Sequence, residues 1–197
     1  MFNKLNISLL SILFIVNISY AQSKSSFSNS NWIAKYPSTW TYQSQKNADG
    51  SLLHMFIAPE RKKNISYCHV TQQGLSPALN PRFSKMTKSQ IRELLLTSDK
   101  EMFSVMYTTV VTAPNFNLMR VGPAVIGKEI PSMSADFTFS NPQGFFYRVH
   151  SSYTLWNKGQ VSIWCQGAGK SPKDAEDGYF LAIDEFQKFI ADFELKF

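Results

Sequence analysis

Residues 161–197, at the end of the chain, constrain the fold more than any other stretch. An apolar, strand-like run that carries Cys165 comes first, and a glycine-containing turn leads from it into a helix pattern. Ser171 is placed to cap this helix, and Pro172 suits its first position. The helix has one apolar stripe, made by Tyr179, Ile183, Phe186, Ile190 and Phe193. Such a stripe must cover an apolar surface, and the upstream sequence predicts that this surface is a sheet.

The sequence upstream predicts a series of strands separated by turns. Turn residues fill positions 47–50 and 141–144, and Pro131 separates two of the strands. The expected strands cover residues 31–37, 40–44, 52–58, 65–72, 121–129, 134–140, 145–156 and 161–166. A helix is expected over residues 88–106, where Thr87 and Gln90 have the spacing of a capping box. Strands that follow one another directly indicate the α+β class with an antiparallel sheet.

Residues 1–21 have the features of a secretory signal peptide. Lys4 supplies the positive charge, an apolar stretch follows, and cleavage is expected after Ala21. The alternative, a permanent membrane anchor, needs a longer apolar run. Residues 22–30 are expected to be a disordered lead-in, and residues 31–197 a single domain. The sequence therefore predicts a bacterial protein that is periplasmic or secreted.

Cys68 and Cys165 are the only cysteines of the chain. Both lie in apolar, strand-like runs, and an exported protein meets oxidising conditions. A disulfide between them is therefore the leading interpretation. Two buried free thiols are the alternative. A catalytic dithiol is disfavoured because redox pairs usually occur as Cys-x-x-Cys.

The motif Gly167-Ala168-Gly169-Lys170-Ser171 lies between a strand and a helix, where a phosphate-binding loop would lie. Such a loop needs a glycine five positions before Gly169, and this chain has Trp164 there. Pro172 also removes one backbone N–H donor from the site. We interpret the motif as a flexible turn and a helix cap, and we expect no cofactor.

His54, His69 and His150 lie on three different expected strands and lack the spacing of metal ligands. Neighbouring strands could still bring His54 and His69 together, which leaves a surface metal site as the alternative to ordinary strand histidines. Cys68 and His69 are adjacent, so in a strand their side chains point to opposite faces and cannot form a catalytic pair. No Gly-x-Ser-x-Gly motif is present. We therefore expect no metal and no catalytic residue.

The chain is rich in aromatic residues, with 16 Phe, 8 Tyr and 4 Trp, and carries a net charge of +6. Aromatic and basic residues together can bind single-stranded nucleic acid, but here the aromatics follow strand and helix periodicities, as core residues do. Nucleic acid is therefore not an expected partner. Phe145, Phe146 and Tyr147 lie beside a turn and are the one candidate contact patch, with a core or strand-edge role as the alternative. The scattered basic charge leaves a weak contact with a membrane surface open.

Two parts of the chain resemble PsbP-like proteins. Residues 32–40, which read Trp-Ile-Ala-Lys-Tyr-Pro-Ser-Thr-Trp, are similar to the Tyr-Pro-x-x-Trp opening strand of that family. The closing hairpin, the strand with Cys165 and the last helix resemble the C-terminal end of the same family. PsbP-like proteins share an α/β/α sandwich with a Ran-binding nuclear-import factor, DcrB-type envelope proteins and LpqN-type lipoproteins. The resemblance implies an antiparallel sheet with helices on both faces and no catalytic machinery, and it carries over no functional residue.

The sequence and the resemblance together predict a non-catalytic, exported binding or assembly accessory protein. Its expected partner is another envelope or secreted protein, and its oligomeric state is not predicted. Two other classes stay open. One is a small secreted hydrolase whose site is built from dispersed polar residues. The other is a secreted envelope or virulence factor that contacts anionic membrane.

Overall fold

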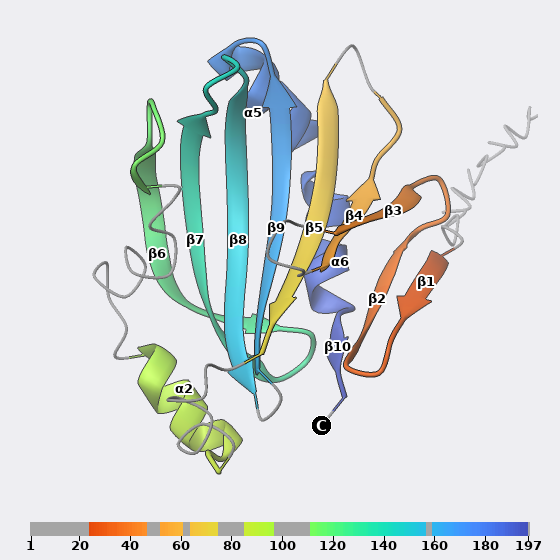
Figure 1. Cartoon of the computed structure of the whole chain (residues 1–197), viewed down its shortest axis with the longest axis vertical. Helices are drawn as coiled ribbons and strands as arrows, with labels where there is room; N and C mark the ends of the chain where they lie inside the picture. The colour runs from red at the N-terminus through yellow and green to blue at the C-terminus, as the bar shows by residue number, and fades with distance from the viewer. Residues whose placement is uncertain are drawn as a thin grey trace, which may run out of the picture.

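The computed structural model describes residues 24–46, 52–60, 64–74, 85–96, 111–156 and 159–196. Their strands form two antiparallel sheets (Figure 1). The large sheet has the order β3-β4-β5-β9-β8-β7-β6, and the small sheet has the order β1-β2-β10. The strands of the large sheet are β3 (Thr41–Lys46), β4 (Leu52–Ile57), β5 (Ile65–Gln73), β6 (Asn117–Ile126), β7 (Ile130–Ser140), β8 (Phe146–Trp156) and β9 (Gly159–Gly169). The strands of the small sheet are β1 (Lys24–Ser28), β2 (Trp32–Pro37) and β10 (Glu194–Leu195).

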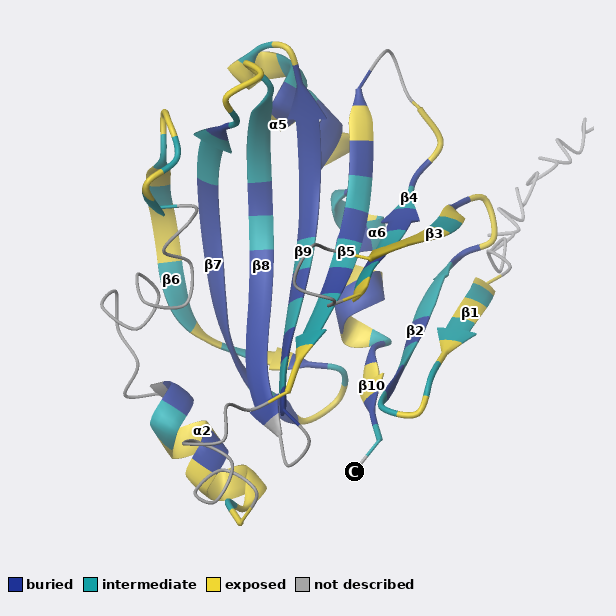
Figure 2. Cartoon of the chain, viewed as in Figure 1, coloured by how far each residue is buried: buried dark blue, intermediate teal, exposed yellow. Residues whose placement is uncertain are grey.

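The large sheet separates two apolar clusters. On one face, the helices α5 (Pro172–Leu181) and α6 (Ile183–Ala191) and the small sheet pack against residues such as Phe56 and Ile163. We call this the helix-covered face; in Figure 1 both helices lie behind the sheet. On the opposite face, Met133, Phe137 and Val149 form the second cluster. The centre of the sheet is therefore buried on both sides, as Figure 2 shows for β7, β8 and β9.

The described helix of the second cluster is α2 (Lys88–Leu96), which lies at one end of the sheet (Figure 1). Its capping box is present, because the Thr87 backbone N–H donates to the Gln90 side chain and the Gln90 N–H donates to Thr87 Oγ1. Ile91 and Leu95 supply the buried residues of α2. The continuation of this helix expected over residues 97–106 lies outside the described residues. The part of the chain that is described does not confirm a helical layer over both faces.

Three glycines bring α5 unusually close to the sheet. A Cβ on Gly167 would lie 2.2 Å from two backbone atoms of α5, and one on Gly169 would lie 2.3 Å from the Asp174 Cβ. Gly178, inside α5, faces Gly167 and the start of β5 less tightly, since its Cβ would lie 3.2 Å from the Asn64 Cβ and 3.3 Å from the Ile65 carbonyl oxygen. The expectation of a flexible turn at Gly167 and Gly169 is therefore wrong. Both residues belong to β9, and they are small because the helix backbone occupies the space of their side chains.

The cap of this helix is confirmed. The Asp174 backbone N–H donates to the Ser171 Oγ at 3.1 Å, and Pro172 occupies the start of the helix.

The predicted disulfide between Cys68 and Cys165 is present, with an S–S distance of 2.03 Å. The two residues lie directly opposite each other on β5 and β9, at a Cα–Cα distance of 4.0 Å. Both side chains point to the helix-covered face and are fully buried. The bond joins an early strand to the strand that precedes α5, so it ties the two parts of the sheet together.

Two expectations about the ends of elements are wrong. Residues 22–30 were expected to lack structure, yet β1 pairs with β2, because Phe27 stacks on Tyr42 and packs against Trp32. Pro131 does not separate two strands: it is the second residue of β7, near the strand start, where a missing N–H is tolerated. The turn before it is made by Gly127, whose φ of 62° suits glycine.

The closing helix is also not continuous. It consists of α5 and α6, and Ala182 between them has φ −118° and ψ 9°. Phe186 and Ile190 of the expected stripe are buried in α6, but Phe193 lies beyond it, just before β10. The break lets α5 follow the glycines of β9 while α6 packs against β2 of the small sheet. Phe189 of α6 also stacks on Trp40, and Phe193, just after α6, stacks on Trp32 of β2.

Candidate binding site

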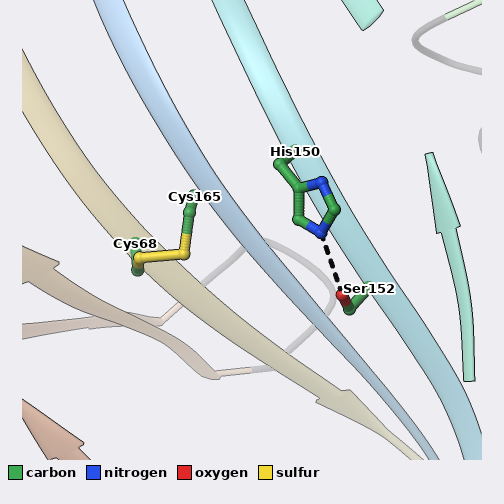
Figure 3. Close-up of a disulfide and its surroundings, with 4 residues drawn as sticks. All are labelled: Cys68, His150, Ser152 and Cys165. Atoms are coloured by element: carbon green, nitrogen blue, oxygen red, sulfur yellow. Dashed lines mark hydrogen bonds between the residues drawn. A yellow bond between two sulfur atoms is a disulfide. The ribbon is translucent and has the colours of Figure 1, made fainter. Parts of the chain in front are cut away.

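A single row of side chains crosses the helix-covered face from β3 to β6. Strand register places its members opposite one another in the order Tyr42, Phe56, Cys68, Cys165, His150, Asp136 and Arg120. The row is aromatic and apolar on one side of the disulfide and ionisable on the other. Figure 3 shows the disulfide with His150 on the neighbouring strand. The ionisable half is the candidate site.

Asp136 is the centre of this site. His150 Nδ1 lies 3.0 Å from Asp136 Oδ1, and the Arg120 Nε donates to Asp136 Oδ2 at 2.9 Å. A terminal nitrogen of Arg120 is also 2.9 Å from the same Oδ2, and Arg148 is 3.8 Å from Oδ1. The Asp136 carboxylate on β7 therefore has three partners: Arg120 on β6, and His150 and Arg148 on β8.

These partners decide the protonation of Asp136. Burial alone would raise the pKa of this carboxyl group. The hydrogen bond with His150 and the charges of His150, Arg120 and Arg148 act in the opposite direction and leave the pKa below its ordinary value. Asp136 is therefore a carboxylate at neutral pH, and the two guanidinium groups beside it carry one positive charge more than this carboxylate neutralises.

Arg148 is the most enclosed cation of the site. Only 11% of its side chain is exposed, and its guanidinium lies 4.8 Å from the centre of the Tyr179 ring of α5. One terminal nitrogen donates to the Val149 carbonyl at 3.0 Å. The Nε is buried and has no hydrogen-bond partner among the described residues. A buried N–H without a partner is costly, so stability alone does not account for an arginine at this position.

The cluster opens into a pocket of about 240 Å³ between the sheet and the helices. Its polar wall is Arg120, Asp136, Arg148 and His150. Its opposite wall comes from α5 and α6 and contains Tyr179, Phe180, Ile183, Phe186, Gln187 and Ile190. Phe180 is 52% exposed at the rim, which is unusual for so large an apolar side chain. The pocket therefore offers a cationic wall and an apolar wall to one ligand.

Ser152, His150 and Asp136 have the order of a catalytic triad. Ser152 Oγ lies 3.4 Å from His150 Nε2, as the dashed line in Figure 3 shows, and His150 Nδ1 lies 3.0 Å from Asp136. Ser152, however, is only 1% exposed and does not line the pocket. A nucleophile must reach the reacting carbon, and this hydroxyl faces no open space. The arrangement orients His150 and does not form an accessible nucleophile.

The structure separates the residues that sequence reasoning singled out. His54 pairs in register with Val70, so it points to the helix-covered face, whereas the adjacent His69 points to the other. The metal site that these two could have shared is therefore ruled out. Among the described residues, no three His, Cys, Asp or Glu side chains lie together as metal ligands would.

Phe145, Phe146 and Tyr147 are all half-buried. The Tyr147 ring stacks on Phe139 at 4.7 Å, and its hydroxyl accepts from the Asn141 side chain at 3.1 Å. Phe146 and Tyr147 are consecutive residues of β8, so their side chains point to opposite faces. A role as a contact patch stays a prediction.

Sequence reasoning missed Arg120, Asp136 and Arg148. Each is a single charged residue in a different expected strand or connection, without a motif. One signal was available: a strand seldom carries Asp or Arg towards a core without a partner. The pairing of strands that brings the three together cannot be derived from the sequence alone.

An antiparallel sheet covered by a C-terminal helix unit is the class of fold that the structure defines. The cyanobacterial PsbP (CyanoP) from Synechocystis sp. PCC 6803, known from a solution structure, is similar over 89% of this chain and 94% of its own, with a TM-score of 0.54 and 12% identity. The chain thus has a PsbP-like fold, as its sequence predicted. At this identity the likeness concerns the fold alone. No protein-family model and no curated protein matches the chain.

Within the part of the chain that the structure describes, no helix combines the length and the apolar character needed to cross a membrane.

Proposed function

We propose that this protein is a non-catalytic, exported accessory protein that binds the apolar C-terminal residue of a partner protein. The observation that carries the proposal is the pocket beside Asp136, with its cationic wall and its apolar wall. The PsbP-like fold supports an accessory role, since the resemblance in the sequence implies one. The partner would be another envelope or secreted protein, met in the periplasm or outside the cell after cleavage behind Ala21.

A carboxylate is the anion that fits the polar wall. Arg120 uses its Nε and one terminal nitrogen on Asp136, and its side chain is 71% exposed, so the rest of its guanidinium faces the solvent. Arg148 adds a second positive charge at the other carboxylate oxygen of Asp136. Two guanidinium groups against one carboxylate leave a charge that a ligand carboxylate would neutralise.

The volume of the pocket limits what accompanies the carboxylate. At about 240 Å³ it is smaller than the roughly 300–1,000 Å³ of pockets for drug-sized ligands. One aliphatic or aromatic side chain against Phe180 and Ile183 would fill it. This favours the last residue of a chain over a larger acidic molecule.

The proposal is tested by titrating the protein without residues 1–21 with N-acetyl-leucine and, separately, with the uncharged amide of this ligand. Binding is monitored through the NMR chemical shifts of the protein's backbone amides. The acid should bind about 10-fold more tightly than the amide, since a charged hydrogen bond contributes roughly 1.5–3 kcal/mol. Arg120→Gln should remove this preference. Lys173→Gln is the matched control, because Lys173 is also a largely exposed cation with a carboxylate partner, and neither Lys173 nor Asp177 lines the pocket. Equal binding of acid and amide would refute the proposal.

The hydrolase alternative has one observation in its favour, the order Ser152–His150–Asp136. A fluorophosphonate probe tests it directly. We expect no labelling of the folded protein, because Ser152 is buried. Labelling that disappears in Ser152→Ala would establish an enzyme and overturn the accessory role.

A further inference from the structure

An unpaired strand edge lies beside the Asp136 site. β6 is the last strand of the large sheet and pairs with β7 on one side (Figure 1). Along its other side, no strand of the described part of the chain is hydrogen-bonded to it. We call the backbone N–H and C=O groups on this side the outer edge of β6. A row of such groups is a template for one more strand.

Pro123 shows which residues of β6 face outward. Inside a strand, proline is found at sheet edges, with its nitrogen on the side that faces away from the sheet. In an antiparallel strand the N–H and C=O of one residue point to the same side, and this side alternates from residue to residue. Val121 and Val125 therefore direct both groups outward, and Pro123 directs its C=O outward. Pro123 and Val125 are exposed, so an added strand can reach this part of the edge.

A β-bulge joins this edge to the pocket. Leu118 lies opposite Phe137 and Arg120 lies opposite Asp136, so Met119 is an extra residue in β6. In a regular strand Leu118 and Arg120 would share a face, and Leu118 packs against the second cluster. The bulge instead turns Arg120 to the helix-covered face, as bulges next to functional sites do. Arg120 thus belongs both to the wall of the pocket and to the edge strand.

The size of the pocket places most of a bound tail outside it. At about 240 Å³ the pocket holds one side chain beside the carboxylate, so the residues before the last one must leave it. Arg120 begins the regular part of β6, which continues to Ile126 and gives room for about six tail residues at roughly 3.4 Å each. A tail that ends at Arg120 and lies along this part runs antiparallel to β6.

We propose that the partner's C-terminal tail adds to the outer edge of β6 as an antiparallel strand, with its carboxylate at Arg120. This inference rests on the proposed function and adds how the tail is held. Main-chain hydrogen bonds to Val121, Pro123 and Val125 would supply affinity that does not depend on the tail's side chains, while the pocket selects its last residue. The tail must be extended, and it carries no proline at the residues paired with these three.

A second copy of this chain is the other occupant for such an edge. Pro123 removes one donor from the edge and the bulge at Met119 twists it, and both features oppose pairing with a long strand. A short tail needs only the residues after the bulge. It also brings the carboxylate that Arg120 and Arg148 neutralise. The charges therefore favour the tail.

Peptide length tests the proposal, in the same NMR titration of the protein without residues 1–21. The hexapeptide N-acetyl-Ser-Thr-Val-Thr-Ser-Leu should bind about 10-fold more tightly than N-acetyl-leucine, because it adds main-chain hydrogen bonds. N-methylation of one backbone amide at a time should weaken binding about 5-fold or more at every second residue and change it little at the residues between. The reason is that alternate amides of an added strand face β6.

A proline in β6 tests the same contact from the protein's side. Val125→Pro removes an outward N–H and leaves the ladder with β7 intact, as Pro123 already does. It should weaken hexapeptide binding about 5-fold and leave N-acetyl-leucine binding unchanged, because Val125 does not line the Asp136 pocket. Val125→Thr is the matched control, since it keeps the N–H and should bind the hexapeptide normally. If Val125→Pro unfolds, the N-methyl series on the unmodified protein decides.

Three results would overturn the proposal. The hexapeptide binds no more tightly than N-acetyl-leucine, or N-methylation weakens binding without the alternation. The third is a dimer in solution that Val125→Pro dissociates, which would assign the edge to a second copy. Failure of the proposed function is distinguishable from all three, because N-acetyl-leucine and its amide would then bind equally.

Discussion

Loss of the disulfide should lower the free energy of unfolding by about 4–5 kcal/mol. The bond joins Cys68 to Cys165, which are 97 positions apart. For a loop of that length the chain-entropy model gives about 4.7 kcal/mol at 25 °C, because the open chain gains conformations only in its unfolded state. A domain is usually stable by about 5–15 kcal/mol, so the reduced protein should be folded but close to its limit.

The perturbation must remove the bond without removing the side chains. Both cysteines are fully buried, so reduction requires unfolding, and alanine substitution would add the cost of a cavity. Protein unfolded in urea with reductant, then refolded with the reductant present, keeps both sulfur atoms in the core. Its urea unfolding, followed by circular dichroism, should show a lower midpoint and a steeper slope, since the open unfolded chain exposes more surface.

Two outcomes would refute this reasoning. A free-thiol count of two in protein isolated without reductant would show that the bond does not form. A difference below about 1 kcal/mol between oxidised and reduced protein would show that the unfolded chain does not gain the expected entropy.

Three further predictions concern single residues. Gly167→Ala should cost at least about 2–3 kcal/mol in a thermal melt, because its Cβ would lie 2.2 Å from the backbone of α5, whereas Gly122→Ala, with nothing within 4 Å, should be tolerated. Because burial lowers the pKa of His69 from 6.5 to about 4, stability is complete above the higher value and falls as pH drops towards the lower; His69→Gln should reduce the loss between pH 7 and pH 4 by about 3 kcal/mol. Asp136→Asn should cost about 3–5 kcal/mol at pH 7, because it leaves Arg148 buried without its counter-charge. Since the pKa of Asp136 is lowered in the fold, its contribution is present above the unfolded value and is lost at lower pH, so variant and wild type should converge below about pH 4.

The sequence predicts elements well where one local signal decides them. Thr87 and Gln90 form the expected capping box, and Ser171 caps the helix that follows β9. Local signals fail where a neighbour far along the chain decides. Gly167 has the local features of a turn, but it lies in a strand because α5 occupies the space of its side chain.

Register is the second limit. The alternation of β7 and β8 shows which residues share a face, but not that Asp136 stands opposite His150 and Arg120. A shift of the register by two residues would keep every side chain on its face of the sheet, but it would separate Asp136 from His150 and Arg120. The candidate site could therefore not be predicted, although each strand that builds it could.

The composition of the helix-covered face also separates stability from function. From β4 to β9 this face is covered by buried apolar side chains such as Phe56, Cys68 and Ile163. Burial of apolar surface there contributes roughly 25 cal/mol per Å² to the free energy of folding. On β7 and β8 the same helices cover Asp136 and Arg148 instead, although apolar residues of similar volume would stabilise the fold at least as well. Enclosed charges that stability does not require are expected where a ligand uses them. On this face, substitutions beyond the disulfide should therefore change ligand binding as well as stability, whereas substitutions before it should change the melting temperature alone.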